Sequence, residues 1–331
     1  MNINKEQALD LLTNIDEKDK IMLIFHDDLD GISSGILMSD YLDGAGVKYK
    51  KMIFSYGKTI EKVKEEVKDC NKIIFMDLAP VAVVRIFPAL KNKKIISIDH
   101  HPEDLKMPEE VLNYRSKEYT PASRMVFELV GGKEWLAVCG VLGDVGDKYE
   151  INGDFINDFM NKNRFSLDDF KNKFSYKLMS FLVYFDDKYD EAFDILKKIK
   201  TLEEIKKIEK YSSQVEKEVK KFEKLFWEDK KKIGEITYFY FEPEFDIKTM
   251  LINRISSESF PGVLIFISPA KDNMNVSARN QSREYNVADI LKKLISGFDK
   301  SGAGGHFSAS GGYFEKKDLK KFEDNLRKLK L

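Results

Sequence analysis

Three short apolar runs in the first third of the chain constrain its fold more than any other feature. They are IMLIF at 21–25, KIIFM at 72–76 and KIISI at 94–98. Such β-branched, almost unbroken runs are typical of strands buried on both faces of a parallel sheet. The segments between them, such as SSGILMSDYL and IEKVKEEVKD, carry apolar residues at helical spacing. This alternation predicts βαβ units and an α/β domain with right-handed crossovers.

The rest of the chain predicts a helical region and a second, smaller α/β domain. A length of 331 residues suggests about two domains. From about residue 152 to 232 the pattern is helical and increasingly charged, and it ends in one long helix or a broken pair. The Glu and Lys residues of this last part are interleaved, which indicates a solvated face rather than a surface that binds nucleic acid. Strand-like segments return after Gly234. We therefore predict domains at 1–185 and 233–331, joined by a helical linker at 186–232.

Composition limits where such a protein acts. The formal net charge is −1, and 43% of the residues are hydrophobic, which is typical of a soluble globular protein rather than one that coats long nucleic acid. No apolar run reaches the roughly 18 residues of a membrane span, and the chain does not begin with an export signal. Cys70 and Cys139 lie in apolar segments without metal or disulfide spacing, which indicates buried free thiols. We therefore expect a cytoplasmic protein without a membrane partner.

Polar residues of the metal-binding kind follow each apolar run. The runs lead into His26-Asp27-Asp28-Leu29-Asp30-Gly31, into Asp77 and into Asp99-His100-His101, and a fourth run at 135–142, a strand or a helix, leads into Gly143-Asp144. Ligands bind at the carboxyl ends of the strands in open parallel sheets, so we expect these side chains in one crevice. Helix capping explains a single such aspartate equally well. It does not explain four acidic clusters that also contain histidines.

Histidine usage indicates metal-dependent hydrolysis. The chain has 4 His, of which His26, His100 and His101 follow predicted strands and His306 lies in a glycine-rich loop. Several carboxylates with imidazoles and no thiolate suit Mn²⁺ or a related divalent ion better than structural zinc. The ligands are too many for one ion with an open position but sufficient for two ions that share a carboxylate. Paired ions activate a water for in-line phosphoryl displacement, which predicts hydrolysis of a phosphate ester or anhydride.

The ordered motifs resemble those of a known family. HDDLDG at 26–31, the Asp77 segment, DHH at 99–101 and GDVGD at 143–147 look like the four motifs of the DHH phosphoesterase superfamily. SARN at 277–280 and GAGGH at 302–306 look like the accompanying DHHA1 domain. The first motif opens with His, as in oligoribonuclease-like and pyrophosphatase-like members, whereas bacterial RecJ-type members begin with Asp. The resemblance spans essentially the whole chain and is weakest over 152–232.

The resemblance implies roles for individual residues. It implies one Mn²⁺ held by His26, Asp28 and Asp77, and a second held by Asp30, Asp77, His100 and Asp144, with Asp77 bridging and with Mg²⁺ or Co²⁺ as substitutes. Asp99 would support the chemistry by orienting an imidazole, and His101 would face the substrate. Asp27 and Asp147 stay outside the ligand set as helix caps or surface acids.

The second domain is expected to bind the substrate. Arg279, with its neighbour Ser277, offers a planar donor fork suited to phosphate. Gly304 and Gly305 let backbone N–H groups approach an anion, and His306 adds a side-chain donor. The alternative is a tight turn with a buried Arg–acid pair. The two-domain arrangement implies a nucleotide gripped across a cleft, with a linker that permits hinge closure.

The leading functional hypothesis is a Mn²⁺-dependent phosphodiesterase that releases nucleoside 5′-monophosphates from short nucleotides. Its substrates would be cyclic or linear dinucleotides, such as cyclic di-AMP and pApA, or short single-stranded oligonucleotides, because the two domains leave no room for an additional strand-binding module. The alternative is a RecJ-like single-strand exonuclease on longer DNA or RNA, as in archaeal members. A pyrophosphatase is disfavoured, and a phosphatase acting on 3′-phosphorylated adenine nucleotides stays open as a side activity. An inactive scaffold protein would require lost ligands, and none of the six is lost. The sequence leaves a homodimer open.

Overall fold

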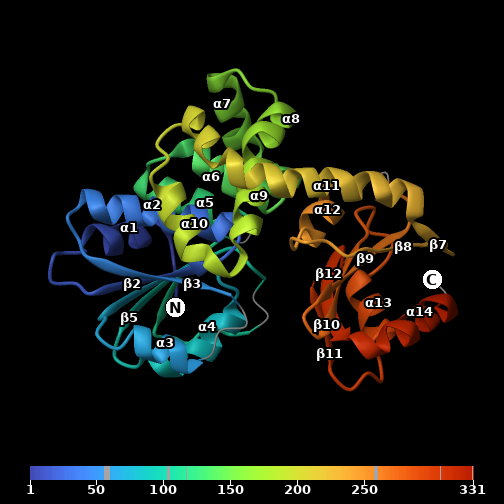
Figure 1. The fold of residues 1–331 in the computed structure, drawn as a ribbon. Coiled ribbons are helices and arrows are strands. Elements are labelled where there is room, and N and C mark those ends of the chain that lie inside the picture. Colours follow the sequence, from blue (N-terminus) through green and yellow to red (C-terminus); the bar gives the residue numbers. More distant parts are fainter. Residues whose placement is uncertain (56–59, 103–104, 117, 257–259, 306, 330) are drawn as a thin grey trace. The chain divides into compact units, whose positions relative to one another are not determined.

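The protein consists of two compact units, Met1–Ser212 and Ser213–Leu331, in a computed structural model (Figure 1). The model describes the whole chain except residues 56–59, 103–104, 117, 257–259, 306 and 330. Each unit combines a sheet with helices, which confirms the predicted α/β class. The predicted domain limits at 185 and 233 stay predictions. No helix in the described part of the chain is long and apolar enough to cross a membrane.

Unit 1 is built on a six-stranded sheet in which all strands are parallel, in the order β1-β6-β5-β4-β2-β3. The strands are β1 (Asn2–Ile3), β2 (Ile21–His26), β3 (Tyr49–Phe54), β4 (Lys72–Met76), β5 (Lys94–Asp99) and β6 (Val111–Arg115). The three predicted strands are β2, β4 and β5, and they are neighbours. The register pairs Phe25 with Met76 and Met76 with Ile98. The residues that follow these three strands therefore lie together at the carboxyl end of the sheet.

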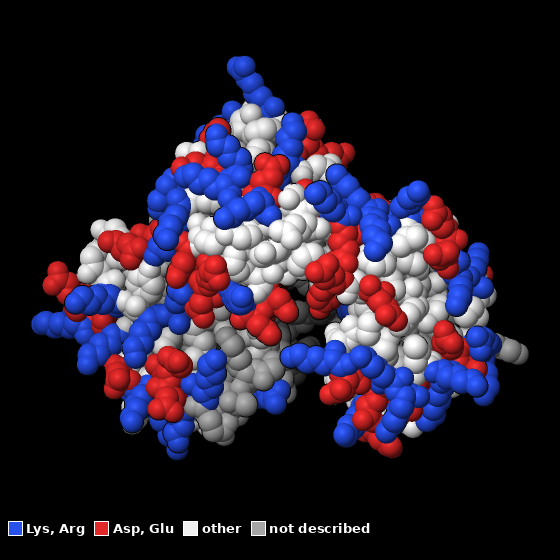
Figure 2. Space-filling view, viewed as in Figure 1, with Lys and Arg blue, Asp and Glu red and all other residues white. Residues whose placement is uncertain are grey.

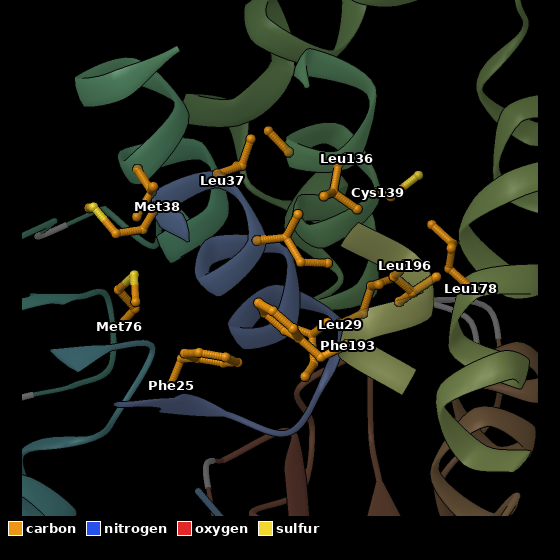
Figure 3. Packing of buried hydrophobic residues seen from close by; sticks show 14 of the residues in the cluster. Phe25, Leu29, Leu37, Met38, Met76, Leu136, Cys139, Leu178, Phe193 and Leu196 are labelled. Carbon is orange, nitrogen blue, oxygen red and sulfur yellow. The ribbon is translucent and has the colours of Figure 1, made fainter. Parts of the chain in front are cut away.

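Helices cover both faces of this sheet, as the unbroken apolar runs predict. They are α1 (Lys5–Thr13), α2 (Leu29–Gly44), α3 (Ile60–Glu66), α4 (Pro80–Ile86), α5 (Ala122–Val130), α6 (Glu134–Gly143), α7 (Gly153–Asn163), α8 (Leu167–Phe170), α9 (Tyr176–Phe185) and α10 (Tyr189–Lys197). Alternate residues of β2 enter different cores: Ile24 joins the cluster with α3 and α4, whereas Phe25 joins the larger cluster. In the larger cluster Phe25 packs on Phe193 of α10, with ring centroids 5.3 Å apart (Figure 3).

Unit 2 contains a mixed six-stranded sheet in the order β11-β12-β10-β9-β8-β7. The strands are β7 (Lys231–Ile233), β8 (Ile236–Tyr240), β9 (Val263–Ala270), β10 (Asn273–Arg279), β11 (Ser301–Gly305) and β12 (Ala309–Glu315). Only the β8–β9 pair is parallel among the pairs between described strands. The glycine-rich segment that we expected as a loop is largely strand, because β11 and β12 pair antiparallel over 301–305 and 310–314.

Helices of unit 2 pack on both faces of this sheet. The helices are α11 (Glu209–Asp229), which begins in unit 1, α12 (Lys248–Ile255), α13 (Val287–Leu294) and α14 (Leu319–Lys328). Residues of α13 and α14 form one core with β9, β10 and β12. On the other face, Phe226 of α11 packs on Phe239 and Phe266, with ring centroids 5.5 and 5.4 Å apart. The predicted long helix is thus part of the second unit's core, while its outer face carries both charges (Figure 2).

Candidate metal centre

The turn from β2 into α2 carries two predicted ligands, His26 and Asp28. His26 ends β2, and Asp28 caps α2 because its Oδ1 accepts a hydrogen bond of 2.9 Å from the backbone N–H of Gly31. The turn is tight: a Cβ at Gly31 would lie 2.4 Å from the carbonyl oxygen of His26. The other oxygen of Asp28, Oδ2, lies 3.0 Å from His26 Nδ1. The turn therefore brings both side chains together.

Asp77 lies between the imidazoles of the other two strand ends. It follows β4, is 1% exposed and has a φ of 58°, a left-handed conformation that aspartate adopts at a modest cost. Its Oδ2 lies 3.6 Å from His26 Nδ1. Its Oδ1 lies 3.3 Å from His100 Nε2 and 3.8 Å from His101 Nδ1. One buried carboxylate therefore faces two groups of ligand atoms.

Two trios within the described residues have ligand atoms within 4.8 Å of one another, and Asp77 belongs to both. The first trio, His26, Asp28 and Asp77, is the predicted ligand set of the first ion. The second trio is Asp77, His100 and His101. It contains His101, which we expected at the substrate, in addition to two predicted ligands of the second ion. A carboxylate common to two ligand groups is the arrangement that a bridging ligand requires.

His100 also lies beside the other two predicted ligands, Asp30 and Asp144. Its Nε2 is 3.4 Å from Asp144 Oδ2 and 3.9 Å from Asp30 Oδ2. The fourth apolar run, which the sequence left as a strand or a helix, forms α6, and Asp144 is the C-cap residue of that helix. The six predicted ligands thus come from three strand ends, the start of α2 and the end of α6.

Asp30 has a structural contact that the sequence did not reveal. Its Oδ2 accepts a hydrogen bond of 2.7 Å from the N–H of Ala122, and its Oδ1 accepts one of 2.9 Å from the N–H of Ser123. These are the first two residues of α5, whose N-cap residue Pro121 provides no side-chain cap. A carboxylate there satisfies helix N–H groups and interacts favourably with the helix dipole. Asp30 therefore holds α5 in place while its Oδ2 faces His100.

Asp99 orients His101. Asp99 Oδ1 lies 2.8 Å from His101 Nδ1, and Asp99 Oδ2 accepts a hydrogen bond of 3.1 Å from the backbone N–H of His101. Asp99 is 2% exposed, so the pair is held rigidly at the end of β5. Asp99 thus engages Nδ1, whereas Nε2 forms no hydrogen bond with a residue that the structure describes. This contact supports the role predicted for Asp99.

The cluster concentrates negative charge in a buried place. Burial raises the pKa of Asp77 well above its usual value, and the carboxylates of Asp28 and Asp30 raise it further. Burial likewise raises the pKa of Asp144. Burial lowers the pKa of His26, but the negative charges of Asp28 and Asp77 outweigh this effect and raise it. The carboxylates therefore repel one another electrostatically unless a positive charge lies between them.

The donor set fits a divalent cation. Asp77 Oδ2 and His100 Nδ1 are buried and form no hydrogen bond with any residue that the structure describes. Buried polar atoms without partners are costly, and a bound cation would neutralise the surrounding carboxylates. Carboxylate oxygens and imidazole nitrogens without a thiolate suit ions such as Mn²⁺ or Mg²⁺.

The two acids that we placed outside the ligand set have other partners. Asp27 Oδ1 lies 3.3 Å from His26 Nε2, and its Oδ2 accepts a short hydrogen bond from Ser55 Oγ. Asp147 forms an ion pair of 2.6 Å with Lys171. Ser55 and Lys171 lie far along the chain from these acids, so no local sequence pattern indicated either contact.

In unit 2 the predicted substrate-binding residues lie on β10 and β11. Arg279 Nε donates to Asn253 Oδ1 at 2.9 Å and its Nη1 to the carbonyl of Ala278 at 3.0 Å. No described carboxylate lies within 4.0 Å of its guanidinium, so the alternative of an Arg–acid pair has no support among these residues. Ser277 Oγ accepts a hydrogen bond of 2.9 Å from Lys248 Nζ, a residue that sequence reasoning missed. Gly304 and Gly305 end β11, and His306 lies outside the described residues.

Comparisons with known proteins agree with this architecture. The model of the DHH family, N-terminal domain, matches residues 20–143, and the model of the DHHA1 domain matches residues 237–330. No curated protein has a matching sequence.

Solved structures share the fold over nearly the whole chain. RecJ in complex with Mn²⁺ from Thermus thermophilus is 12% identical with a TM-score of 0.70, over 98% of this chain and 54% of that one. A manganese-bound exonuclease RecJ is 15% identical with a TM-score of 0.71, over 98% and 93% of the two chains. CDC45 from Entamoeba histolytica is 13% identical with a TM-score of 0.55, over 99% of both chains. The chain thus spans about half the length of the Thermus RecJ.

The two domain models match in the order that the sequence motifs predicted, and residues of the DHH motifs gather at the carboxyl end of the sheet in unit 1. The chain belongs to the DHH/DHHA1 phosphoesterase superfamily, a superfamily of metal-dependent phosphoester hydrolases.

Proposed function

We propose that the protein is a Mn²⁺-dependent phosphodiesterase that hydrolyses short nucleotides to nucleoside 5′-monophosphates. Its substrates are cyclic or linear dinucleotides, such as cyclic di-AMP and pApA, and short oligonucleotides. The observation that carries the proposal is the position of Asp77, whose two oxygens face separate groups of ligand atoms. A shared carboxylate is what a two-metal phosphodiesterase needs at its centre.

The proposed first ion is held by His26, Asp28 and Asp77. The second is held by Asp77 and His100, with Asp30 and Asp144 beside them as further ligands. When bound, such a pair of ions supplies a water of lowered pKa and neutralises charge on the phosphoryl group. The tight turn at Gly31, the left-handed backbone at Asp77 and the contacts of Asp30 with α5 fix the ligands beforehand.

His101 acts on the substrate in this proposal. Asp99 holds Nδ1 of the ring, so Nε2 donates a hydrogen bond to a phosphate oxygen or a proton to the leaving oxygen. Burial lowers the pKa of His101, but the hydrogen bond with Asp99 and the charge of Asp77 raise it above the usual value. A raised pKa keeps more of the imidazole protonated near neutral pH, as a proton donor requires.

Unit 2 contributes substrate binding through Ser277, Arg279 and the backbone of Gly304 and Gly305, with His306 proposed from the motif alone. The alternative is a RecJ-like exonuclease, which the likeness of this fold to the RecJ structures supports. The length of the substrate distinguishes it from the leading proposal. On labelled strands of graded length, a rate that collapses beyond about five nucleotides supports short substrates. Processive shortening of long strands supports the exonuclease.

The experiment that tests the metal centre is Asp77→Ala, with Asp158→Ala, an exposed carboxylate on α7, as the matched control. We expect Mn²⁺ to raise the melting temperature of the wild type and of the control, because an ion that binds only the folded state stabilises it. Asp77→Ala should lose both this shift and turnover of pApA while remaining folded. Near-normal turnover in Asp77→Ala would refute the shared-carboxylate centre, and an inactive scaffold would show no turnover in the wild type.

A further inference from the structure

Lys248 is a buried lysine without a counter-ion. It is the first residue of α12 and is 8% exposed. Its Nζ donates a hydrogen bond of 2.9 Å to Ser277 Oγ, and no carboxylate among the described residues lies within 4.0 Å of it. Burying an ammonium group without a paired charge is costly, and proteins rarely do so without a partner. Its position at the start of α12 does not explain why this ammonium group is buried.

The charges that surround Lys248 do not neutralise it. Burial lowers its pKa, the exposed Asp246 partly opposes that effect, and the nearby Arg279 adds to it. Arg279 is itself partly buried, and burial lowers its pKa to about 10. Two cations thus lie close together in a place where water is largely excluded, which favours an anion as the missing component.

The geometry of Arg279 leaves room for such an anion. Its Nε and Nη1 donate to Asn253 of α12 and to the carbonyl of Ala278, whereas its Nη2 donates to no described residue. Ser277 and Arg279 are two residues apart on β10 and therefore point to the same face of the sheet. Lys248 Nζ reaches this same face at Ser277. The ammonium of Lys248, from α12, and the guanidinium of Arg279, from β10, thus both lie on this face of the sheet.

The next two strands of the sheet beside Ser277 carry glycines level with it and therefore present only backbone there. The strand register places Ser277 opposite Gly311 of β12, and Gly311 opposite Gly304 of β11. A Cβ added at Gly304 would have no heavy atom within 4 Å, and one added at Gly311 would approach only the carbonyl of Val276, at 3.8 Å. Because directly opposed residues share a face of the sheet, an open strip without side chains runs from Ser277 across two strands. A group bound at Lys248 and Arg279 can extend along this strip.

We infer that Lys248 binds a phosphate group of the substrate together with Ser277 and Arg279, and that it favours a phosphomonoester over a phosphodiester. Guanidinium and ammonium are complementary in this role: the first is a planar fork, the second a point charge. A phosphomonoester carries close to two negative charges at neutral pH, so it matches two cations better than a singly charged diester does. The inference rests on the proposed function only for the identity of the ligand as a nucleotide.

Binding to the full chain without added metal tests the site independently of turnover. With chelator present, calorimetry should show that AMP binds and adenosine does not. Lys248→Met should weaken AMP binding about 10-fold or more, the size expected for a hydrogen bond to a charged group, and Lys248→Arg should restore part of it. Lys292→Met, an exposed lysine on α13, serves as the control and should bind AMP like the wild type.

Steady-state kinetics with Mn²⁺ then tests the preference. In Lys248→Met the KM for pApA should rise about 10-fold or more, with a much smaller change for ApA, which lacks the phosphomonoester. Equal losses for pApA and ApA, or unchanged AMP binding in a folded Lys248→Met, would show that Lys248 only supports β10. If Lys248→Met does not fold, Ser277→Ala, which removes the hydrogen-bond partner of Lys248, carries the same comparison. Lys248-dependent AMP binding without hydrolysis of any nucleotide would leave the site standing and overturn the proposed function.

Discussion

Replacing Gly31 by alanine tests whether the turn after β2 is as tight as the structure indicates. The added Cβ would lie 2.4 Å from the carbonyl oxygen and 2.7 Å from the Cβ of His26. Restoring an ordinary contact of about 3.4 Å requires a shift of about 1 Å in the backbone that carries His26 and Asp28. Overpacking of this kind costs about 1–3 kcal/mol, and the better helix propensity of alanine returns up to about 1 kcal/mol. We expect the free energy of unfolding to fall by about 1–2 kcal/mol.

The effect on turnover should be larger than the effect on stability. A misplacement of about 1 Å at a catalytic centre can cost about 100-fold in rate. The assays are urea denaturation, Mn²⁺-dependent melting temperature and turnover of pApA.

The matched control is Gly44→Ala at the other end of α2, where an added Cβ meets nothing within 4 Å. That variant should keep full activity and gain up to about 1 kcal/mol. If Gly31→Ala behaves like Gly44→Ala in all three assays, the close approach at His26 is not a constraint and the reasoning fails.

Two further predictions concern charge and substrate binding. Asp99→Asn should lower the pKa of His101, because the hydrogen bond and charge that raise it above its usual value are weakened. If His101 acts as the proton donor, activity is lost as pH rises through its pKa, so the alkaline limb of the kcat profile should move to lower pH. kcat should also fall about 10-fold or more; an unmoved limb would contradict this role. Arg279→Ala should raise the KM for pApA about 10-fold or more with a smaller effect on kcat, and should leave the Mn²⁺-induced rise in melting temperature intact. Loss of that rise would place Arg279 at the metal centre instead.

The sequence predicted the interior strands of unit 1 and missed its outer ones. β2, β4 and β5 are adjacent in the middle of the sheet, so both faces of each are covered and their apolar runs are unbroken. β3 lies at an edge and includes the polar Lys50 and Lys51, and β6 next to the other edge includes Asn113. The same pattern rule therefore succeeds only where burial is two-sided. In unit 2 the glycines of β11 and β12 carry no side-chain alternation, so a strand resembled a loop.

The sequence placed the ligand types at strand ends, but contacts between distant segments were beyond its reach. The register of β2, β4 and β5 follows from the buried runs, and it brings His26, Asp77 and Asp99 together at the carboxyl end of the sheet. The bonds between Asp30 and the start of α5 join residues 92 and 93 positions apart. Lys248 belongs to no recognisable motif in the sequence, and only its burial against Ser277 marks it.

Helix capping and metal binding are not competing explanations for these aspartates, because a carboxylate has two oxygens. Asp28 uses Oδ1 to cap α2 and presents Oδ2 to His26. Asp99 uses both oxygens to fix the ring and the backbone of His101. In each case a bond to the scaffold removes rotamer freedom from a group at the site, so less conformational entropy is lost when a metal or substrate binds. The tight strand-to-helix turns that shape this fold are therefore also what orients its ligands. Substitutions that loosen a cap at the site should weaken metal binding before they unfold the unit.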